Sequence, residues 1–137
     1  MKSGRPVLLI EDDEIDRLVI KRVFKKVGLS NPLICLDNGS ALFQWLQQHT
    51  PALPALILLD LNLPGEDGLE ILARLKTDPY YNLIPIIILT TSNDPTDRKV
   101  CFRHGVVGYM IKTIDPELYT KKINAIIDYW SASEVAH

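Results

Sequence analysis

With 137 residues, 47% of them hydrophobic and 23% charged, the chain has the length and composition of one globular domain. Its formal net charge of −2 lacks the strong basic excess of a dedicated nucleic-acid-binding domain, so we exclude that class of protein. Because the N-terminal apolar run is too short for a signal peptide, and Cys35 and Cys101 form no metal or disulfide framework, we expect a cytoplasmic protein with reduced thiols and no membrane attachment.

The first predicted strand is a short apolar run at residues 6–11, and a helix is predicted to follow it up to Gly28. The first turn of this helix is acidic, which suits the positive end of a helix dipole, and Gly28 fits as its stop. The expected apolar stripe consists of Ile15, Leu18, Val19, Arg22/Val23 and Lys26/Val27. Four basic residues cluster in one short segment of the helix and fit a solvated face better than a phosphate-binding patch; they are Lys21, Arg22, Lys25 and Lys26.

A second strand is predicted at residues 31–37, and a second helix, entered through a turn, at residues 38–49. Pro51 and Pro54 break the chain before a third strand at residues 55–60. The remaining predicted elements are helices at 67–78, 94–105 and 115–130 and strands at 84–91 and 107–112.

Strands that are apolar on both faces and alternate with amphipathic helices predict a parallel sheet covered by helices on both sides. Right-handed crossovers leave few topologies for such a chain. Since no long linker, low-complexity tract or second-domain signal is present, we expect residues 1–137 to form one α/β domain without an output domain, with its core at about residues 6–130.

Polar side chains gather where the predicted strands end, which is the edge at which open parallel sheets bind ligands. They are Glu11, Asp12 and Asp13 at the first strand, Asp60 at the third, Thr90, Thr91 and Ser92 at the fourth, and Lys112 at the fifth. Asp12 or Asp13 could instead be the N-cap of the first helix. Asp60 fits a capping role poorly, because Asp67 is better placed to cap the next helix.

Carboxylates placed this close together repel one another unless a cation is present. Oxygen ligands without a nearby His or Cys favour a hard cation such as Mg²⁺ over zinc or copper. Once the charge is neutralised, Asp60 can attack phosphorus and form an aspartyl phosphate. The Lys112 ammonium and the Thr90 hydroxyl can then donate hydrogen bonds to the new phosphoryl group, so these residues together predict a phosphoacceptor site.

Four stretches, IEDDE, LILLDLNLPGEDGLEIL, IPIIILTTS and GYMIK, closely resemble the receiver domain of two-component response regulators over about residues 6 to 130. The resemblance implies a CheY-like, flavodoxin-like (βα)5 fold, doubly wound, with a five-stranded parallel sheet in the order 2-1-3-4-5. The stretches LTTS and IIDYW make the chain similar to the single-domain regulators that partner cyanobacterial phytochromes. The resemblance implies a signalling protein rather than an enzyme, with self-catalysed phosphotransfer and dephosphorylation.

Carried over by position, the resemblance makes Asp60 the phosphoacceptor and a metal ligand. It implies that Asp12 binds Mg²⁺ directly, that Glu11 holds a metal-bound water, and that the backbone carbonyl of Asn62 completes the protein's share of the ligands. The donor of the phosphoryl group is implied to be a sensor histidine kinase, here a phytochrome.

The resemblance also assigns the residues that respond to the phosphoryl group. Thr90 and Lys112 are implied to move toward it, and Tyr109 is the implied switch aromatic, although an aromatic residue on the fifth strand can also simply pack. The side chains of Asn62 and Thr91 are implied to tune dephosphorylation. The response is expected to reshape the face formed by the fourth helix, fifth strand and fifth helix for partner binding.

We expect the same face to form a homodimer, because it holds more apolar residues than one core face needs. These residues are Val100, Phe102, Val106, Leu118 and Tyr119.

One departure from the family pattern is Lys112-Thr113, where receivers usually have Lys-Pro with a cis bond. A cis bond before a residue other than proline costs about 2.5–4 kcal/mol, so we expect a trans bond here. Two other functions stay open. An aspartyl-phosphate phosphatase would need a second carboxylate where this chain has Asn62, and a phosphorylation-independent docking module would have lost its switch at the Lys112-Thr113 position.

Overall fold

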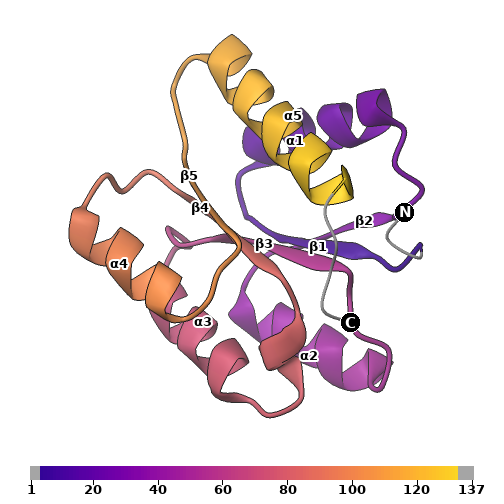
Figure 1. Cartoon of the computed structure of the whole chain (residues 1–137), viewed down its shortest axis with the longest axis vertical. Coiled ribbons are helices and arrows are strands. Elements are labelled where there is room, and N and C mark those ends of the chain that lie inside the picture. Colours follow the sequence, from indigo (N-terminus) through magenta and orange to yellow (C-terminus); the bar gives the residue numbers. More distant parts are fainter. Residues whose placement is uncertain (1–3, 133–137) are drawn as a thin grey trace.

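The computed structural model describes residues 4–132 and consists of one parallel sheet with helices on both faces (Figure 1). The strands are β1 (Val7–Ile10), β2 (Leu33–Leu36), β3 (Leu56–Asp60), β4 (Ile86–Thr90) and β5 (Gly108–Ile111). The helices are α1 (Glu14–Val27), α2 (Gly39–His49), α3 (Gly68–Thr77), α4 (Pro95–Arg103) and α5 (Pro116–Ala132), with a 3-10 turn η1 (Tyr81–Leu83). The strand order β2-β1-β3-β4-β5 confirms the predicted fold class and topology.

The sheet separates two hydrophobic cores, because alternate residues of each strand point to opposite faces. On β1, Leu8 and Ile10 pack with α2 and α3, whereas Val7 and Leu9 pack with α1 and α5. Figure 1 shows α1 and α5 on one side of the sheet and α2, α3 and α4 on the other. Burial on both faces explains why the central strands β1, β3 and β4 are continuous apolar runs rather than alternating ones.

Aspartates cap four of the described helices, α1, α3, α4 and α5; at α5, the side chain of Asp115 accepts a hydrogen bond from the amide of Glu117. The side chain of Asp13 accepts hydrogen bonds from the backbone of Ile15 and Asp16, so Asp13 rather than Asp12 is the N-cap of α1. Asp67 caps α3 as predicted, and Asp94 caps α4. Since Asp13 performs the capping, Asp12 is available to the acidic edge of the sheet.

The predicted apolar stripe of α1 is wrong in its first turns. Ile15 is 74% exposed and Leu18 is 46% exposed, whereas Ile20, Val23 and Phe24 face the core. The helix carries two apolar series of similar spacing, and the spacing alone does not select the one that meets the sheet. Four basic residues in the second half of α1 are exposed, as predicted; they are Lys21, Arg22, Lys25 and Lys26.

The expected composition of the dimer face also needs correction. Val106 and Tyr119 are buried in the core and leave no side chain for a partner. Phe102 is 50% exposed and Leu118 is 43% exposed, so these two remain on the surface. Within the described residues, no helix is both long enough and apolar enough to cross a membrane.

Candidate acidic site at the carboxyl edge of the sheet

The parallel register brings the predicted site residues to one edge of the sheet. Ile10 at the end of β1 pairs with Leu59 of β3, and Asp60 pairs with Leu89 of β4, so the strands end side by side. Glu11 and Thr90 are fully buried at this edge, and Asp60 is 2% exposed. Two buried carboxylates and a buried hydroxyl are costly to place without partners, which points to a functional arrangement.

The three predicted metal-ligating acids lie together. One carboxylate oxygen from each of Glu11, Asp12 and Asp60 can be chosen so that all three lie within 4.8 Å of one another. Burial, together with the neighbouring Asp60 carboxylate, raises the pKa of Glu11 to about 8, while Lys112 acts in the opposite direction. A crowded set of oxygen donors without His or Cys fits a hard divalent cation, which would relieve the repulsion.

The ammonium group of Lys112 lies inside this cluster. Its Nζ is 2.6 Å from Glu11 Oε1, 3.0 Å from Asp16 Oδ2 and 3.2 Å from Asp60 Oδ2. Burial lowers the pKa of Lys112, but the surrounding carboxylates, Glu11 above all, outweigh burial and hold that pKa above its usual value. Lys112 is therefore a charged hydrogen-bond donor next to Asp60.

The backbone after Lys112 follows the expected trans path. Among the described residues, the cis peptide bond is that between Thr50 and Pro51, not the bond between Lys112 and Thr113. The amide of Lys112 donates to the carbonyl of Thr90 at 2.7 Å, which extends the pairing of β4 and β5 by one residue. The predicted placement of Lys112 near Asp60 therefore does not require a proline at position 113.

The side chain of Asn62 connects the loop after β3 with the loop after β4. Its Oδ1 accepts hydrogen bonds from the Thr90 hydroxyl at 3.0 Å, the Thr91 amide at 2.8 Å and the Thr91 hydroxyl at 3.1 Å. The backbone amide of Asn62 donates to Asp60 Oδ1 at 2.8 Å. The Thr90 hydroxyl thus points to Asn62 in this state, while the predicted ligand role of the Asn62 carbonyl stays a prediction.

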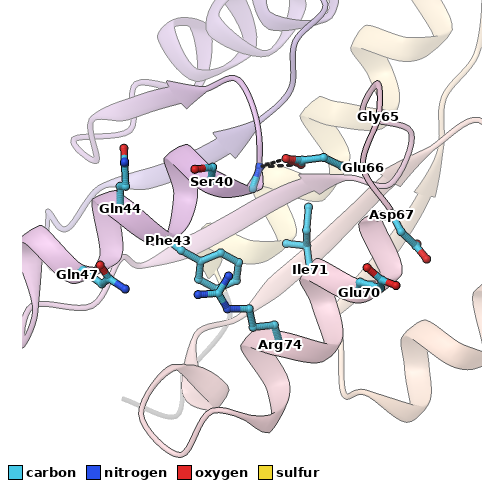
Figure 2. Close-up of a pocket in the computed structure, with 11 residues that line it drawn as sticks. Ser40, Phe43, Gln44, Gln47, Gly65, Glu66, Asp67, Glu70, Ile71 and Arg74 are labelled. Carbon is cyan, nitrogen blue, oxygen red and sulfur yellow. Dashed lines mark hydrogen bonds between the residues drawn. The ribbon is translucent and has the colours of Figure 1, made fainter.

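The loop after Asp60 is held by close packing on its other side. A Cβ at Gly68 would lie 2.5 Å from the Cα of Leu61, so only glycine permits this approach. Figure 2 shows Glu66 reaching across to the start of α2, where its carboxylate accepts the Gly39 amide at 2.8 Å. These contacts fix the segment that carries Asn62.

A hollow of about 540 Å³ lies beside this contact, between α2 and α3. Figure 2 shows residues that line it. The guanidinium of Arg74 lies 3.6 Å from the centre of the Phe43 ring within it. None of the residues of the acidic cluster line this hollow, so we assign it no part in the chemistry of the site.

Tyr109 lies on β5 beside the loop that follows β4. Its side chain is half-buried, and its hydroxyl donates to the carbonyl of Ser92 at 3.2 Å. Its ring lies 6.4 Å from that of Phe102, measured between centroids. Tyr109 therefore contacts both the Thr90–Ser92 segment and α4, and its predicted switching stays a prediction.

Two neighbours of the acidic cluster were not predicted from the sequence. Asp16 binds Lys112 as described above, and Arg17 donates to the carbonyl of Glu11 and to the carboxylate of Asp37. Both sit in the first turn of α1, where acidic and basic residues usually face solvent. No local sequence pattern marks these contacts, because they depend on the direction in which α1 leaves β1.

Comparisons with known proteins agree with this geometry. The model of the response regulator receiver domain family matches residues 7–124. Response regulator Rcp1 of Synechocystis sp. is 36% identical over 129 residues, which is 90% of this chain and 87% of Rcp1. The probable methanogenesis regulatory protein FilR2 of Methanothrix harundinacea is 32% identical over 127 residues, or 90% of this chain and 82% of FilR2.

Two solved structures share the fold over nearly the whole chain. The Mn²⁺-bound form of Rcp1 has a TM-score of 0.89 at 33% identity and covers 97% of this chain and 99% of its own. The phosphorylated cyanobacterial phytochrome response regulator RcpA has a TM-score of 0.89 at 27% identity. The match covers 98% of this chain and 100% of the RcpA chain.

Proposed function

This chain belongs to the response regulator receiver domain family, and from that premise we propose that Asp60 accepts a phosphoryl group from the phosphohistidine of a sensor histidine kinase. Receiver domains are signalling proteins of two-component systems, and they interact with histidine kinases. The observation that carries the proposal is the position of the buried Asp60 carboxylate, between two further acids and the ammonium of Lys112.

The proposed transfer is a substitution at phosphorus. A carboxylate oxygen of Asp60 forms a bond to phosphorus while the bond from phosphorus to the imidazole nitrogen breaks, and the released electron pair stays on that nitrogen, which takes up a proton. The product is an acyl phosphate at Asp60, and its hydrolysis by water returns the carboxylate. Both steps are self-catalysed in this proposal, since the kinase supplies the phosphoryl group and the receiver supplies the site.

Receiver domains bind a divalent metal ion at their acidic pocket, and we assign Mg²⁺ to that role here. Glu11, Asp12 and Asp60 would hold it, together with the backbone carbonyl of Asn62. When bound, Mg²⁺ offsets the repulsion between the acids and the incoming phosphoryl oxygens. The solved structure of a relative, the Mn²⁺-bound form of Rcp1, supports a divalent ion in this family.

Donors already near Asp60 can stabilise the phosphoryl group. Lys112 Nζ lies 3.2 Å from Asp60 Oδ2 and can turn one N–H to a phosphoryl oxygen. The Thr90 hydroxyl reaches the same oxygens only after it leaves Asn62. We propose that this departure shifts the loop after β4, and that Tyr109, which bonds that loop at Ser92, changes its position in response.

The rim of the pocket offers a surface for the kinase. Ile15, 74% exposed, and Leu18, 46% exposed, follow the acidic residues on α1, and Ile114, fully exposed, lies two residues after Lys112. Apolar side chains in water beside a phosphoacceptor fit contact with the domain that carries the phosphohistidine. A phytochrome is the proposed kinase, and the similarity to the phytochrome response regulator RcpA supports that choice.

The output surface is proposed to be the face formed by α4, β5 and α5, which contains Tyr109. Phe102 of α4 and Leu118 of α5 are exposed large apolar residues, and a homodimer would cover them. The single-domain organisation and a cytoplasmic location are also proposals. The first is supported by the match to Rcp1, which spans 87% of the length of Rcp1. The second is supported by the free thiols of Cys35 and Cys101.

The rival functions have less support. A phosphatase would need a general acid at position 62, and the Asn62 side chain instead accepts three hydrogen bonds from the loop after β4. A docking module that had lost its switch would not need Lys112 held within 3.2 Å of Asp60.

The direct test is Asp60→Asn, which keeps the shape of the side chain and removes the nucleophilic carboxylate. With a small-molecule phosphodonor and Mg²⁺, intact-mass spectrometry should show one added phosphoryl group on the native protein and none on this variant. Asp128→Asn, an exposed substitution on α5, serves as the matched control and should be labelled like the native protein. Full labelling of the Asp60→Asn variant would remove Asp60 from its proposed role.

A further inference from the structure

The ammonium group of Lys112 has three N–H donors, and three carboxylates accept from it or lie in contact with it. These are Glu11 at 2.6 Å, Asp16 at 3.0 Å and Asp60 at 3.2 Å. Glu11 and Asp60 also belong to the acidic cluster with Asp12, whereas Asp16 is not a member of that cluster. Lys112 is therefore held by three acids. A divalent cation in the cluster would also bind Glu11 and Asp60, but it would not bind Asp16.

Asp16 is well placed to hold its partner still. It lies in the first turn of α1, where its backbone amide donates to the capping carboxylate of Asp13 at 3.1 Å. The side chain of Asp16 is 23% exposed and that of Lys112 is 10% exposed, so water screens the pair less than an ion pair on the surface. A short carboxylate on an anchored helical turn can thus restrain the long, flexible stem of a lysine.

The surroundings of the pair enclose it further. Tyr119 of α5 is buried, and its hydroxyl has no hydrogen-bond partner among the described residues. Burial, followed by the charge of Asp16, raises the pKa of this hydroxyl. Residues of α1 and α5 share one hydrophobic core on this side of the sheet, and the side chains of Asp16 and Lys112 are mostly buried beside it.

We propose that Asp16 is a positioning residue, which keeps the Lys112 ammonium beside Asp60 when Glu11 and Asp60 are engaged by a divalent cation and the phosphoryl group. This inference rests on the proposed function of Asp60. With Asp16 present, the lysine keeps one fixed acceptor and turns its other donors to the phosphoryl oxygens. Without Asp16, the ammonium has no fixed acceptor left when Glu11 and Asp60 are bound to the cation and the phosphoryl group.

An ordinary structural role for Asp16 makes a different prediction. An acid in the first turn of a helix stabilises that helix through its dipole, and Glu14 of the same turn does so equally. Glu14 is exposed and has no contact with Lys112 in the described structure. Glu14→Gln is therefore the matched control for Asp16→Asn, because both remove one charge from the same turn.

The first experiment measures the proton exchange of the Lys112 ammonium by ¹⁵N NMR, with and without Mg²⁺. This readout does not depend on phosphorylation. In the native protein and in Glu14→Gln we expect slow exchange under both conditions. In Asp16→Asn we expect exchange to become about tenfold faster, and mainly when Mg²⁺ is present, because a charge-assisted hydrogen bond is lost. Equal exchange in Asp16→Asn and the native protein with Mg²⁺ would overturn the proposal.

The second experiment measures the rate constant of phosphorylation at saturating phosphodonor and, separately, the affinity for Mg²⁺. Asp16→Asn and Asp16→Ala should lower the rate constant by about tenfold and leave the Mg²⁺ affinity within about twofold, because Asp16 acts on Lys112 and not on the metal. Asp16→Glu, which keeps the charge, should recover part of the rate. An unchanged rate constant in Asp16→Asn, or an equal loss in Glu14→Gln, would contradict the proposal. If Asp60 were not the phosphoacceptor, Asp60→Asn would still be labelled, whereas the NMR result would stand on its own.

Discussion

At the scale of single residues, the site depends on how each polar side chain is held before any phosphoryl group arrives. The Thr90 hydroxyl donates to Asn62, and the Lys112 ammonium contacts Glu11, Asp16 and Asp60. Phosphorylation must therefore exchange existing hydrogen bonds rather than recruit free groups. The net change in free energy is the difference between the old and the new partners, and it is smaller than the sum of the new contacts suggests.

Asn62 is the residue whose removal should loosen the loop after β4 most directly. Asn62→Ala deletes the acceptor of three hydrogen bonds, including that of the Thr91 amide at 2.8 Å, so we expect this amide to exchange with solvent about tenfold faster. Hydrogen-exchange NMR measures the effect. Asn62→Asp retains an acceptor and should stay close to the native rate; slow exchange in both variants would show that Asn62 does not hold the loop.

At this scale the sequence predicted that Glu11, Asp60, Thr90 and Lys112 would lie at one edge, because each stands at or next to the end of a strand in a fold that aligns strand ends. The roles of these residues stay predictions. The sequence did not predict Asp16 and Arg17, since their contacts depend on the direction in which α1 leaves β1. Nor did it predict that Asn62 would accept the Thr90 hydroxyl, a contact between two loops far apart in the chain. Such contacts follow from tertiary structure and have no local pattern.

At the scale of elements, α1 shows where periodicity is insufficient. Ile15 and Ile20 both belong to apolar series, yet Ile20 is fully buried and Ile15 is 74% exposed. The N-cap at Asp13 and the short connection from β1 decide the rotation of the helix on the sheet. By contrast, the strands were predicted well. A central strand is buried on both faces, so its position follows from the apolar run without deciding which face meets the core.

The two isoleucines of α1 therefore offer a test at the element scale. Ile20→Ala should lower the free energy of unfolding by about 2–5 kcal/mol, because it leaves a cavity in the core between α1 and the sheet. Ile15→Ala should change it by no more than about 0.5 kcal/mol, because the side chain is already in water. Chemical denaturation of both variants makes the comparison. A larger loss in Ile15→Ala than in Ile20→Ala would mean that the helix lies on the sheet in the rotation expected from the first stripe.

At the scale of the whole molecule, the acidic site and the proposed partner surface lie on different parts of the fold. The carboxyl edge of the sheet holds the acidic site, and the face of α4, β5 and α5 holds the surface proposed for partners (Figure 1). Tyr109 joins the two, since its hydroxyl binds the loop of the site at Ser92 and its ring lies beside Phe102 of α4. The resemblance supplied the strand order, but only the structure separates Val106 and Tyr119, which are buried, from the exposed residues of that face.

The homodimer is tested at this scale. Phe102→Ser and Leu118→Ser remove exposed apolar side chains from the face and should weaken dimerisation by about tenfold each, as expected when an apolar side chain at an interface is lost. Sedimentation velocity over a concentration series gives the dissociation constants, and Ile15→Ser on α1 is the control outside the face. A native protein that sediments as a monomer at tens of micromolar, both phosphorylated and unphosphorylated, would exclude this dimer.

The central claim is that phosphorus becomes bonded to the carboxylate of Asp60, and one measurement addresses that bond itself. Borohydride reduces an acyl phosphate to an alcohol, so a phosphorylated aspartate becomes homoserine and is located by peptide mass spectrometry. After treatment with a phosphodonor and Mg²⁺, we expect homoserine at position 60 and not at position 12, the other aspartate of the cluster. Homoserine at another position, or an unmodified Asp60 in folded protein that binds Mg²⁺, would contradict the claim.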